Sequence, residues 1–343
     1  MGSDSDLPIM QEAIDILESF DIQIEVDIVS AHSCLPMIAV LPETTQQVSD
    51  VLRVCYEEGV PVVPRGSGTS LAGGAMPTAD CVILGVAKLN NVLETDYDNR
   101  LIRVQSGRTN LSVSGAVEED GFFYAPDPSS QLACAIAGNI GMNSGGAHCL
   151  KYGVTTNNLM GVTMVMMDGE IVEIGGSHLD SAGLDLLGVI CGSEGQLGVV
   201  TEATLRILSK PVGARPVLIA FDKNEVAGAC VADIIKAGVL PVAMEFMDRL
   251  CIETSENFAN AGYPNAEALL IVEVEGSELE IQEQLTKIIS IAEKHNHGKA
   301  SGTYQTVSLR LTDKPRVGSS LLALYALSGW QLGAKQAQEP TRL

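Results

Sequence analysis

Residues 64–74 read Pro-Arg-Gly-Ser-Gly-Thr-Ser-Leu-Ala-Gly-Gly and directly follow an apolar run at 60–63 that predicts a strand. The glycines let the backbone approach a ligand closely, and the exposed amides and three hydroxyls suit a phosphate or pyrophosphate. No Gly-Lys-Ser/Thr follows, so this is not a Walker loop, and Leu71 occupies the third glycine position of the dinucleotide-binding fingerprint. Taken alone, the stretch could equally be a tight turn.

Three further clusters of Gly, Ser, Asn and Pro follow, separated by apolar runs. They read PDPSS at 126–130, AGNIGMNSGG at 137–146 and GSEGQLGVVTE at 192–202. Four such clusters are hard to explain as unrelated turns. A long ligand threaded between two sub-domains accounts for all of them.

The pattern around these clusters predicts an α+β fold. Strands at 37–41, 60–63 and 81–86 with a helix at 45–58 indicate a parallel βαβ unit, and strands at 101–104, 171–174 and 199–208 a more antiparallel layer. A second α+β domain is expected after Arg215. Its strands are expected at 217–221, 243–246 and 268–274, and its helices at 226–237, from 250 and at 279–295.

The glycine-rich segments RGSGTSLAGGA, YAPDPSSQ, GNIGMNSGGAHCLKYG and GSEGQLGVVTE together resemble one family. It is the vanillyl-alcohol oxidase (PCMH-type) family of FAD-binding proteins, and within it the glycolate oxidase FAD subunits and D-lactate dehydrogenases are most similar. The resemblance implies a two-subdomain PCMH-type FAD-binding domain at 34–211 and a partial substrate (cap) domain at 212–297.

The resemblance also implies which residues hold FAD. The pyrophosphate would be wrapped by Arg65, Gly66, Ser67, Gly68, Thr69, Ser70, Gly73 and Gly74. Pro126, Asp127 and Ser129 would lie beside the flavin, and the next stretch of cofactor would be lined by Gly138, Asn139, Asn143, Ser144, Gly145 and Gly146. Glu194, Gly195 and Val199 would close over the ribose and adenine. No histidine occurs between residues 33 and 147, so we expect noncovalent FAD.

The implied activity is the oxidation of a small D-2-hydroxy acid, glycolate to glyoxylate or D-lactate to pyruvate, by hydride transfer to the flavin. The resemblance further implies that electrons pass to a separate iron–sulfur subunit. The eight cysteines include no CxxC pair, which agrees with that division of labour.

The sequence departs from the family in its catalytic motifs. An H-x-G-D-G-N-x-H segment, a later glutamate–histidine–glycine segment and a terminal asparagine–proline–glycine–lysine signature do not occur. The catalytic residues therefore stay unassigned. His148 is a candidate for the flavin edge, with a satisfied polar residue as the alternative, and no metal site is expected.

Residues 298–343 differ in charge from the rest of the chain. They carry a net charge of +4, whereas the preceding residues carry −26. The reversal predicts a foreign or frame-shifted tail, with packing onto the cap domain as the alternative.

Residues 1–33 show a second resemblance, to the start of the carboxyaminoimidazole ribonucleotide mutase family. The matching residues are Gly2, Ser3, Ser5 and Asp6, with Ser30, Ala31 and His32. Ser33 replaces the family's arginine, so we interpret this part as a fused fragment with a helix and a strand at 22–29. An incidental acidic lead-in is the alternative.

Composition narrows the class of partners. The formal net charge of −22 makes nucleic acid and anionic lipid unfavourable partners. Neither a secretory signal nor an apolar stretch of membrane-spanning length is apparent, so a cytoplasmic protein, peripheral to the inner membrane through partner subunits, is expected.

Three functions therefore remain open: a D-2-hydroxy-acid oxidoreductase, a flavin-binding but catalytically incomplete fragment, and, less favoured, the nucleotide mutase.

Overall fold

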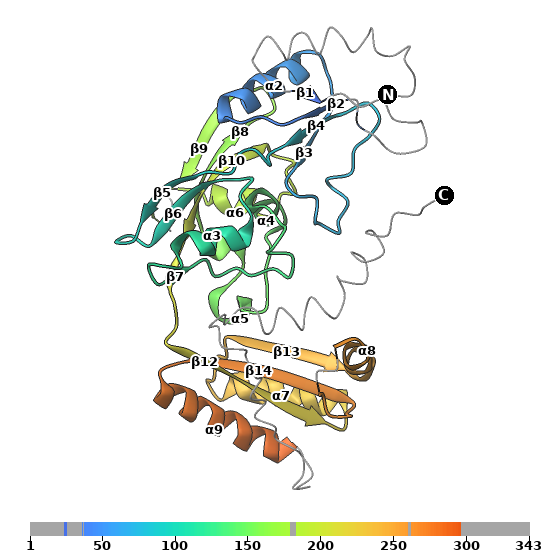
Figure 1. Cartoon of the computed structure of the whole chain (residues 1–343), viewed down its shortest axis with the longest axis vertical. Coiled ribbons are helices and arrows are strands. Elements are labelled where there is room, and N and C mark those ends of the chain that lie inside the picture. Colours follow the sequence, from blue (N-terminus) through green and yellow to red (C-terminus); the bar gives the residue numbers. More distant parts are fainter. Residues whose placement is uncertain (1–23, 26–35, 37, 179–182, 260–261, 296–343) are drawn as a thin grey trace. The chain divides into compact units, whose positions relative to one another are not determined.

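The computed structural model describes residues 24–25, 36, 38–178, 183–259 and 262–295, which form two compact units (Figure 1). Unit 1 contains the described residues up to Gly145 together with Gly153–Ser209, and unit 2 contains Gly146–Tyr152 and those from Lys210 onward. Most of the predicted amino-terminal fragment and all of residues 298–343 lie outside the described residues.

The first sheet of unit 1 confirms the predicted parallel unit. Its order is β1-β2-β4-β3, with β2 and β3 both parallel to β4. Helix α2 starts where the Thr44 hydroxyl accepts a hydrogen bond from the Gln47 amide, and it buries apolar residues at helical spacing, Val48 and Leu52 among them, in one core with Leu84. The elements are β1 (Ile24–Glu25), β2 (Ile38–Val40), α2 (Thr45–Glu57), β3 (Val62–Arg65) and β4 (Val82–Gly85).

The second sheet of unit 1 is antiparallel throughout, as predicted, in the order β5-β6-β10-β8-β9. Its strands are β5 (Val92–Asp96), β6 (Leu101–Gln105), β8 (Leu159–Val165), β9 (Ile171–Gly175) and β10 (Val199–Arg206). The remaining elements of unit 1 are α3 (Asn110–Val117), β7 (Phe122–Phe123), α4 (Ile136–Met142), η2 (Thr155–Asn158), α6 (Leu186–Ile190) and β11 (Leu208–Ser209).

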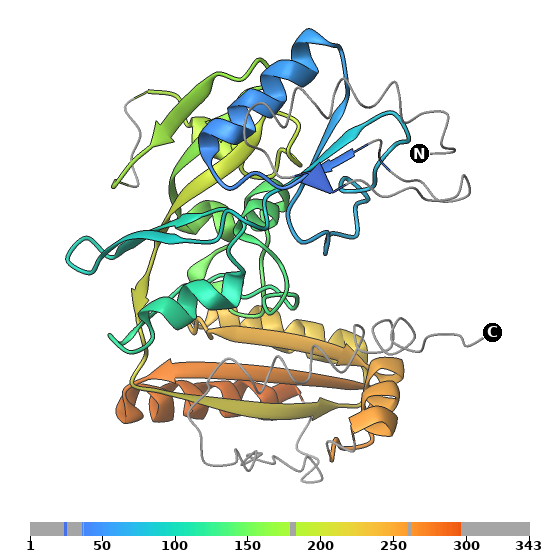
Figure 2. The ribbon, with the colours of Figure 1, turned by 45° about the horizontal axis from the view of Figure 1, so that its top comes forward.

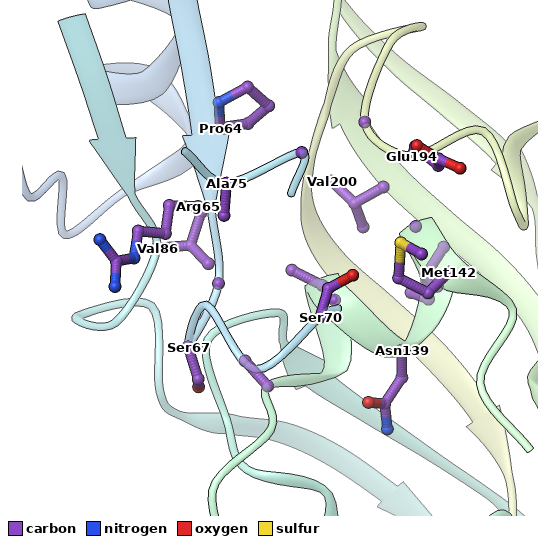
Figure 3. A pocket seen from close by; sticks show the side chains of 18 of the residues that line it. Pro64, Arg65, Ser67, Ser70, Ala75, Val86, Asn139, Met142, Glu194 and Val200 are labelled. Carbon is purple, nitrogen blue, oxygen red and sulfur yellow. The ribbon is translucent and has the colours of Figure 1, made fainter. Parts of the chain in front are cut away.

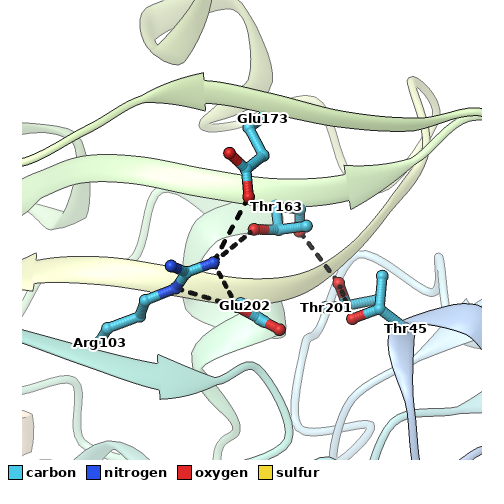
Figure 4. Close-up of polar contacts among 6 residues, drawn as sticks. All are labelled: Thr45, Arg103, Thr163, Glu173, Thr201 and Glu202. Carbon is cyan, nitrogen blue, oxygen red and sulfur yellow. Dashed lines mark hydrogen bonds and ion pairs between the residues drawn. The ribbon is translucent and has the colours of Figure 1, made fainter. Parts of the chain in front are cut away.

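A polar network crosses this second sheet (Figure 4). The Arg103 guanidinium donates to Glu202 at 2.9 Å and to the Thr163 hydroxyl at 3.3 Å, and it lies 3.6 Å from a Glu173 carboxylate oxygen. Four adjacent strands thus supply the residues of one network, which fixes their register.

Unit 2 is a three-stranded antiparallel sheet in the order β12-β14-β13, visible in yellow to orange in Figure 2. Alternate residues of β14, such as Leu270 and Val272, share a core with Ile234 of α7 and Ile288 of α9, whereas Ile271 packs with Ile252 of α8. The elements are α5 (Cys149–Tyr152), β12 (Gly213–Phe221), α7 (Asn224–Lys236), β13 (Ala243–Asp248), α8 (Arg249–Ala259), β14 (Ala268–Gly276) and α9 (Glu278–His295). None of the described helices is both long and apolar enough to span a bilayer.

Candidate cofactor site

A cavity of about 230 Å³ lies in unit 1 where three chain segments meet (Figure 3). The first segment is the end of β3 with the glycine-rich loop, the second includes α4, and the third runs from the end of α6 into β10. Ser130 of the PDPSS cluster also lines the cavity, so all four clusters singled out in the sequence contribute to its walls.

Backbone contacts hold the second and third segments together. The Glu194 amide donates to the Gly141 carbonyl and the Gly192 amide to the Ile140 carbonyl, each at 2.8 Å. Residue 194 adopts a left-handed conformation, with φ of 57°, to make this approach. Two main-chain hydrogen bonds thus join these two segments of the cavity wall.

Gly68 shows why glycine is needed in the first segment. Its φ of +69° is unfavourable for other residues, and a Cβ atom there would lie 2.8 Å from Nη2 of Arg65. The loop and the arginine side chain therefore pack directly on one another. Arg65 and Glu194 are the charged residues among the described residues that line the cavity.

Asn139 provides a test of whether a polar ligand fits the cavity. The residue is 1% exposed, and its side-chain nitrogen Nδ2 has no hydrogen-bond partner among the described residues. Buried amides normally donate, so this nitrogen, which is itself shielded from solvent, is an unsatisfied group just behind the cavity wall. Cys134 also lines the cavity, and burial raises the pKa of its thiol, which favours the protonated form.

The structure brings most of the predicted site residues together. Those that line the cavity are Arg65, Gly66, Ser67, Gly68, Thr69, Ser70, Gly74, Gly138, Asn139, Ser144, Glu194, Gly195 and Val199. Those that do not are Gly73, Pro126, Asp127, Ser129, Asn143, Gly145 and Gly146. Gly146 falls in unit 2.

One residue of the PDPSS cluster, Ser130, lines the cavity, and the expected place of Pro126, Asp127 and Ser129 beside a flavin stays a prediction. Pro126 is buried, and its carbonyl accepts a hydrogen bond from the Asn110 side chain at 3.0 Å. Ser130, which the sequence analysis did not select, lines the cavity instead of Ser129. The other lining residues missed from the sequence include Ile140, Met142 and Ile190, apolar residues beside the glycines. Adjacency to a glycine cluster is the signal that could have found them.

The catalytic candidate His148 belongs to unit 2 and is not among the residues lining the cavity. Its Nε2 lies 3.6 Å from Oε2 of Glu273, and both side chains are largely buried. Of the other histidines, His295 lies 2.9 Å from an Asp233 carboxylate oxygen, and His178 is exposed.

Comparison with known families finds two matching domains. Residues 36–175 match the FAD binding domain family, and residues 210–317 match the C-terminal domain of FAD-linked oxidases. The second match includes the first part of the segment set apart by its charge.

Comparison with curated proteins finds glycolate oxidase subunit GlcD of Escherichia coli, 46% identical over 268 residues that make up 78% of this chain and 54% of that protein. GlcD of Bacillus subtilis is 38% identical, covering 78% and 57%, and a D-lactate dehydrogenase of Archaeoglobus fulgidus is 33% identical, covering 70% and 54%. The chain spans about half the length of these relatives.

Among solved structures, p-cresol methylhydroxylase with substrate bound aligns with a TM-score of 0.68 and 16% identity, covering 85% of this chain and 65% of that one. Alkyldihydroxyacetonephosphate synthase aligns with a TM-score of 0.66 and 20% identity, covering 76% and 51%. At these identities the alignments establish the PCMH-type fold.

Proposed function

Because this chain is a homologue of the FAD-linked oxidases and carries their FAD-binding domain, we propose that it holds FAD noncovalently and serves the oxidation of a small D-2-hydroxy acid. The observation that carries this proposal is the cavity at which the glycine-rich loop, α4 and the segment around Glu194 meet. When bound, FAD would supply the acceptor for a hydride from the substrate.

The cavity residues would hold the cofactor by backbone and side-chain donors. The loop at Gly66–Ser70 offers amides and hydroxyls beside the Arg65 cation, which suits the pyrophosphate. Asn139 would donate to a cofactor oxygen or ring nitrogen, and the backbone around Glu194 would close the adenosine end. The residues that line the cavity would thus bind the pyrophosphate and adenosine parts of FAD, as the sequence predicts.

We also propose a partner. The GlcD relatives are named as subunits, so this protein would act within a multisubunit enzyme, passing electrons to an iron–sulfur subunit and lying at the cytoplasmic face of the inner membrane through such partners. A glycolate- or D-lactate-sized acid is the substrate class that the relatives' names support.

A second function, flavin binding without turnover, is favoured by one observation. The histidine-rich motif of the resembled enzymes occurs nowhere in this chain. The two functions share the cofactor and differ in chemistry.

The test begins with the absorbance of the purified full chain between about 350 and 500 nm, followed by denaturation and quantification of released FAD. FAD near one per chain supports the cofactor site, and turnover of glycolate or D-lactate with an artificial electron acceptor then selects oxidation over binding alone. A colourless chain that cannot be reconstituted with FAD would overturn both.

A further inference from the structure

Residues Gly146–Tyr152, which we call the arm, form a short excursion of the chain. They belong to unit 2, although the residues before and after them belong to unit 1. The base of the excursion is closed within unit 1, where the Ser144 carbonyl accepts hydrogen bonds from the Thr155 amide at 3.0 Å and the Thr155 hydroxyl at 2.8 Å. The base of the arm is therefore fixed by hydrogen bonds within unit 1.

The end of the arm that leads back to Thr155 is held to β14 by one buried carboxylate. Lys151 Nζ lies 2.7 Å from Oε1 of Glu275, and the Tyr152 hydroxyl donates to the same oxygen. The Glu275 side chain is 5% exposed, so these charge-assisted bonds form away from bulk water. Burial, with Glu275 beside it, raises the pKa of Tyr152, and the phenol stays a donor across the neutral range.

Two further contacts hold the arm against the same sheet. Ala147 packs against the apolar cluster that contains Leu269 and Ile271 of β14, and His148 lies 3.6 Å from the buried Glu273. Contacts at several positions along seven residues fix the orientation of the arm as well as its place.

The base of the arm is also part of the cavity wall. Ser144 lines the cavity, and its neighbour Asn143 holds a left-handed conformation with φ of 48°. The Asn143 side-chain oxygen accepts from the Thr156 amide at 3.0 Å, beside the Ser144–Thr155 bonds. Loss of order in the arm would therefore loosen the hydrogen bonds that shape this wall.

We propose that Lys151 and Tyr152 are positioning residues for the cofactor cavity, acting through the arm, with Glu275 as their anchor. An anchored arm keeps the Ser144 wall ordered before a ligand arrives, so binding does not have to order it. By reciprocity, a ligand in the cavity strengthens the hold of the arm on β14. The coupling between FAD binding and the arm rests on the proposed function. The ordering of the Ser144 wall by the arm does not depend on it.

The first experiment needs no cofactor. Hydrogen exchange of the Thr155 and Thr156 amides is measured in the full chain, in Tyr152→Phe and in Glu275→Leu. We expect exchange about ten-fold faster in Glu275→Leu and an intermediate change in Tyr152→Phe, which keeps the ring volume. Glu267→Leu is the matched control, because it breaks an exposed ion pair with Arg249 in the same unit. Unchanged exchange in both arm variants would overturn the inference.

The second experiment adds FAD. We expect Glu275→Leu to weaken FAD binding about ten-fold and to alter the visible circular dichroism of the bound flavin. Lys151→Arg keeps a cation beside Glu275 and should stay close to the wild-type values of both. FAD should also slow exchange of β14 amides in the wild type and not in Glu275→Leu. Equal affinities and spectra in wild type and Glu275→Leu would contradict the coupling. A wild type that binds no FAD would instead contradict the proposed function, and the cofactor-free exchange would still decide the role of the arm.

Discussion

The hydroxyl of Thr45, the first residue of α2, donates a hydrogen bond to the hydroxyl of Thr201 in β10, with 3.0 Å between the oxygens (Figure 4). Thr201 in turn donates to the carbonyl oxygen of Thr163 in β8 at 3.2 Å. Because Thr201 is fully buried, this short chain of bonds joins the helix of the first sheet to the second sheet without water.

Replacing that central hydroxyl tests its contribution. Thr201→Val keeps the shape of the side chain and leaves the Thr45 hydroxyl without its acceptor, so we expect the free energy of unfolding to fall by about 1–2 kcal/mol in urea titration. Thr204→Val, on the same strand and half-buried, should change it by less than about 0.5 kcal/mol. Equal effects of the two changes would show that the bond contributes nothing specific.

Comparing Gly68→Ala with Gly59→Ala distinguishes the loss of stability caused by backbone strain from the loss of FAD caused by a changed cavity wall. Gly68→Ala and Gly59→Ala place a Cβ at almost the same φ, +69° and +67°, but nothing lies within 4 Å of a Cβ at Gly59. Both variants should lose about 1 kcal/mol of stability or more from the left-handed backbone. Gly68→Ala alone should also release its FAD, measured as flavin per chain after gel filtration. Full retention of FAD in Gly68→Ala would remove that loop from the cofactor site.

Replacing Asn139 by leucine is expected to have opposite effects on the free energy of unfolding and on FAD affinity. Its buried Nδ2 has no hydrogen-bond partner among the described residues, which costs stability, so Asn139→Leu should leave the free energy of unfolding unchanged or raise it by about 1 kcal/mol. The same change removes a donor for the ligand and should lower FAD affinity about ten-fold or more, measured by flavin fluorescence titration. A fall in stability without a fall in affinity would mean that the amide serves the fold.

The buried thiols predict a loss of stability at alkaline pH. Burial raises the pKa of Cys55, Cys191 and Cys230 to about 11, against 9.0 for an unperturbed thiol. Between these values the unfolded chain releases protons that the folded chain retains, so stability is full below about pH 9 and falls as the pH rises toward 11. The fall should be on the order of 1–2 kcal/mol for each thiol.

Urea titrations at pH 8, 9, 10 and 11 measure this loss, and Cys230→Ala identifies its source. The variant should be less stable than the wild type at pH 8, because the residue is fully buried, yet lose less stability between pH 9 and 11. Parallel pH profiles would assign the alkaline loss to other groups.

The features that the sequence predicted well are those marked by a local pattern of residues. The loop from Arg65 and the turn at Glu194 were found because glycine and hydroxyl residues mark places where the main chain itself makes the wall. Helix α2 was found, to within one residue, because its buried positions recur at helical spacing.

Elements without local periodicity were missed or shortened. All seven residues of β8 are buried, so no alternation marks it as a strand. Strand β12 begins at Gly213, before Pro216, where the sequence pattern suggested a later start. β12 is an edge strand, and an edge tolerates a residue without an amide donor. The contact of Lys151 with Glu275 was invisible for a different reason, since 124 residues separate the pair and neither local pattern points to the other.

That separation also orders events during translation. At about 5–20 residues per second, a ribosome that has added Lys151 needs roughly 6–25 s more to add Glu275. The arm is thus made well before the strand that receives it, and every residue of unit 1 has been polymerised by the time that strand appears. Unit 2 can therefore fold completely only after β14 has been synthesised and has bound the arm. A pause in translation or an early release of the chain before β14 would leave the arm without the strand that it binds.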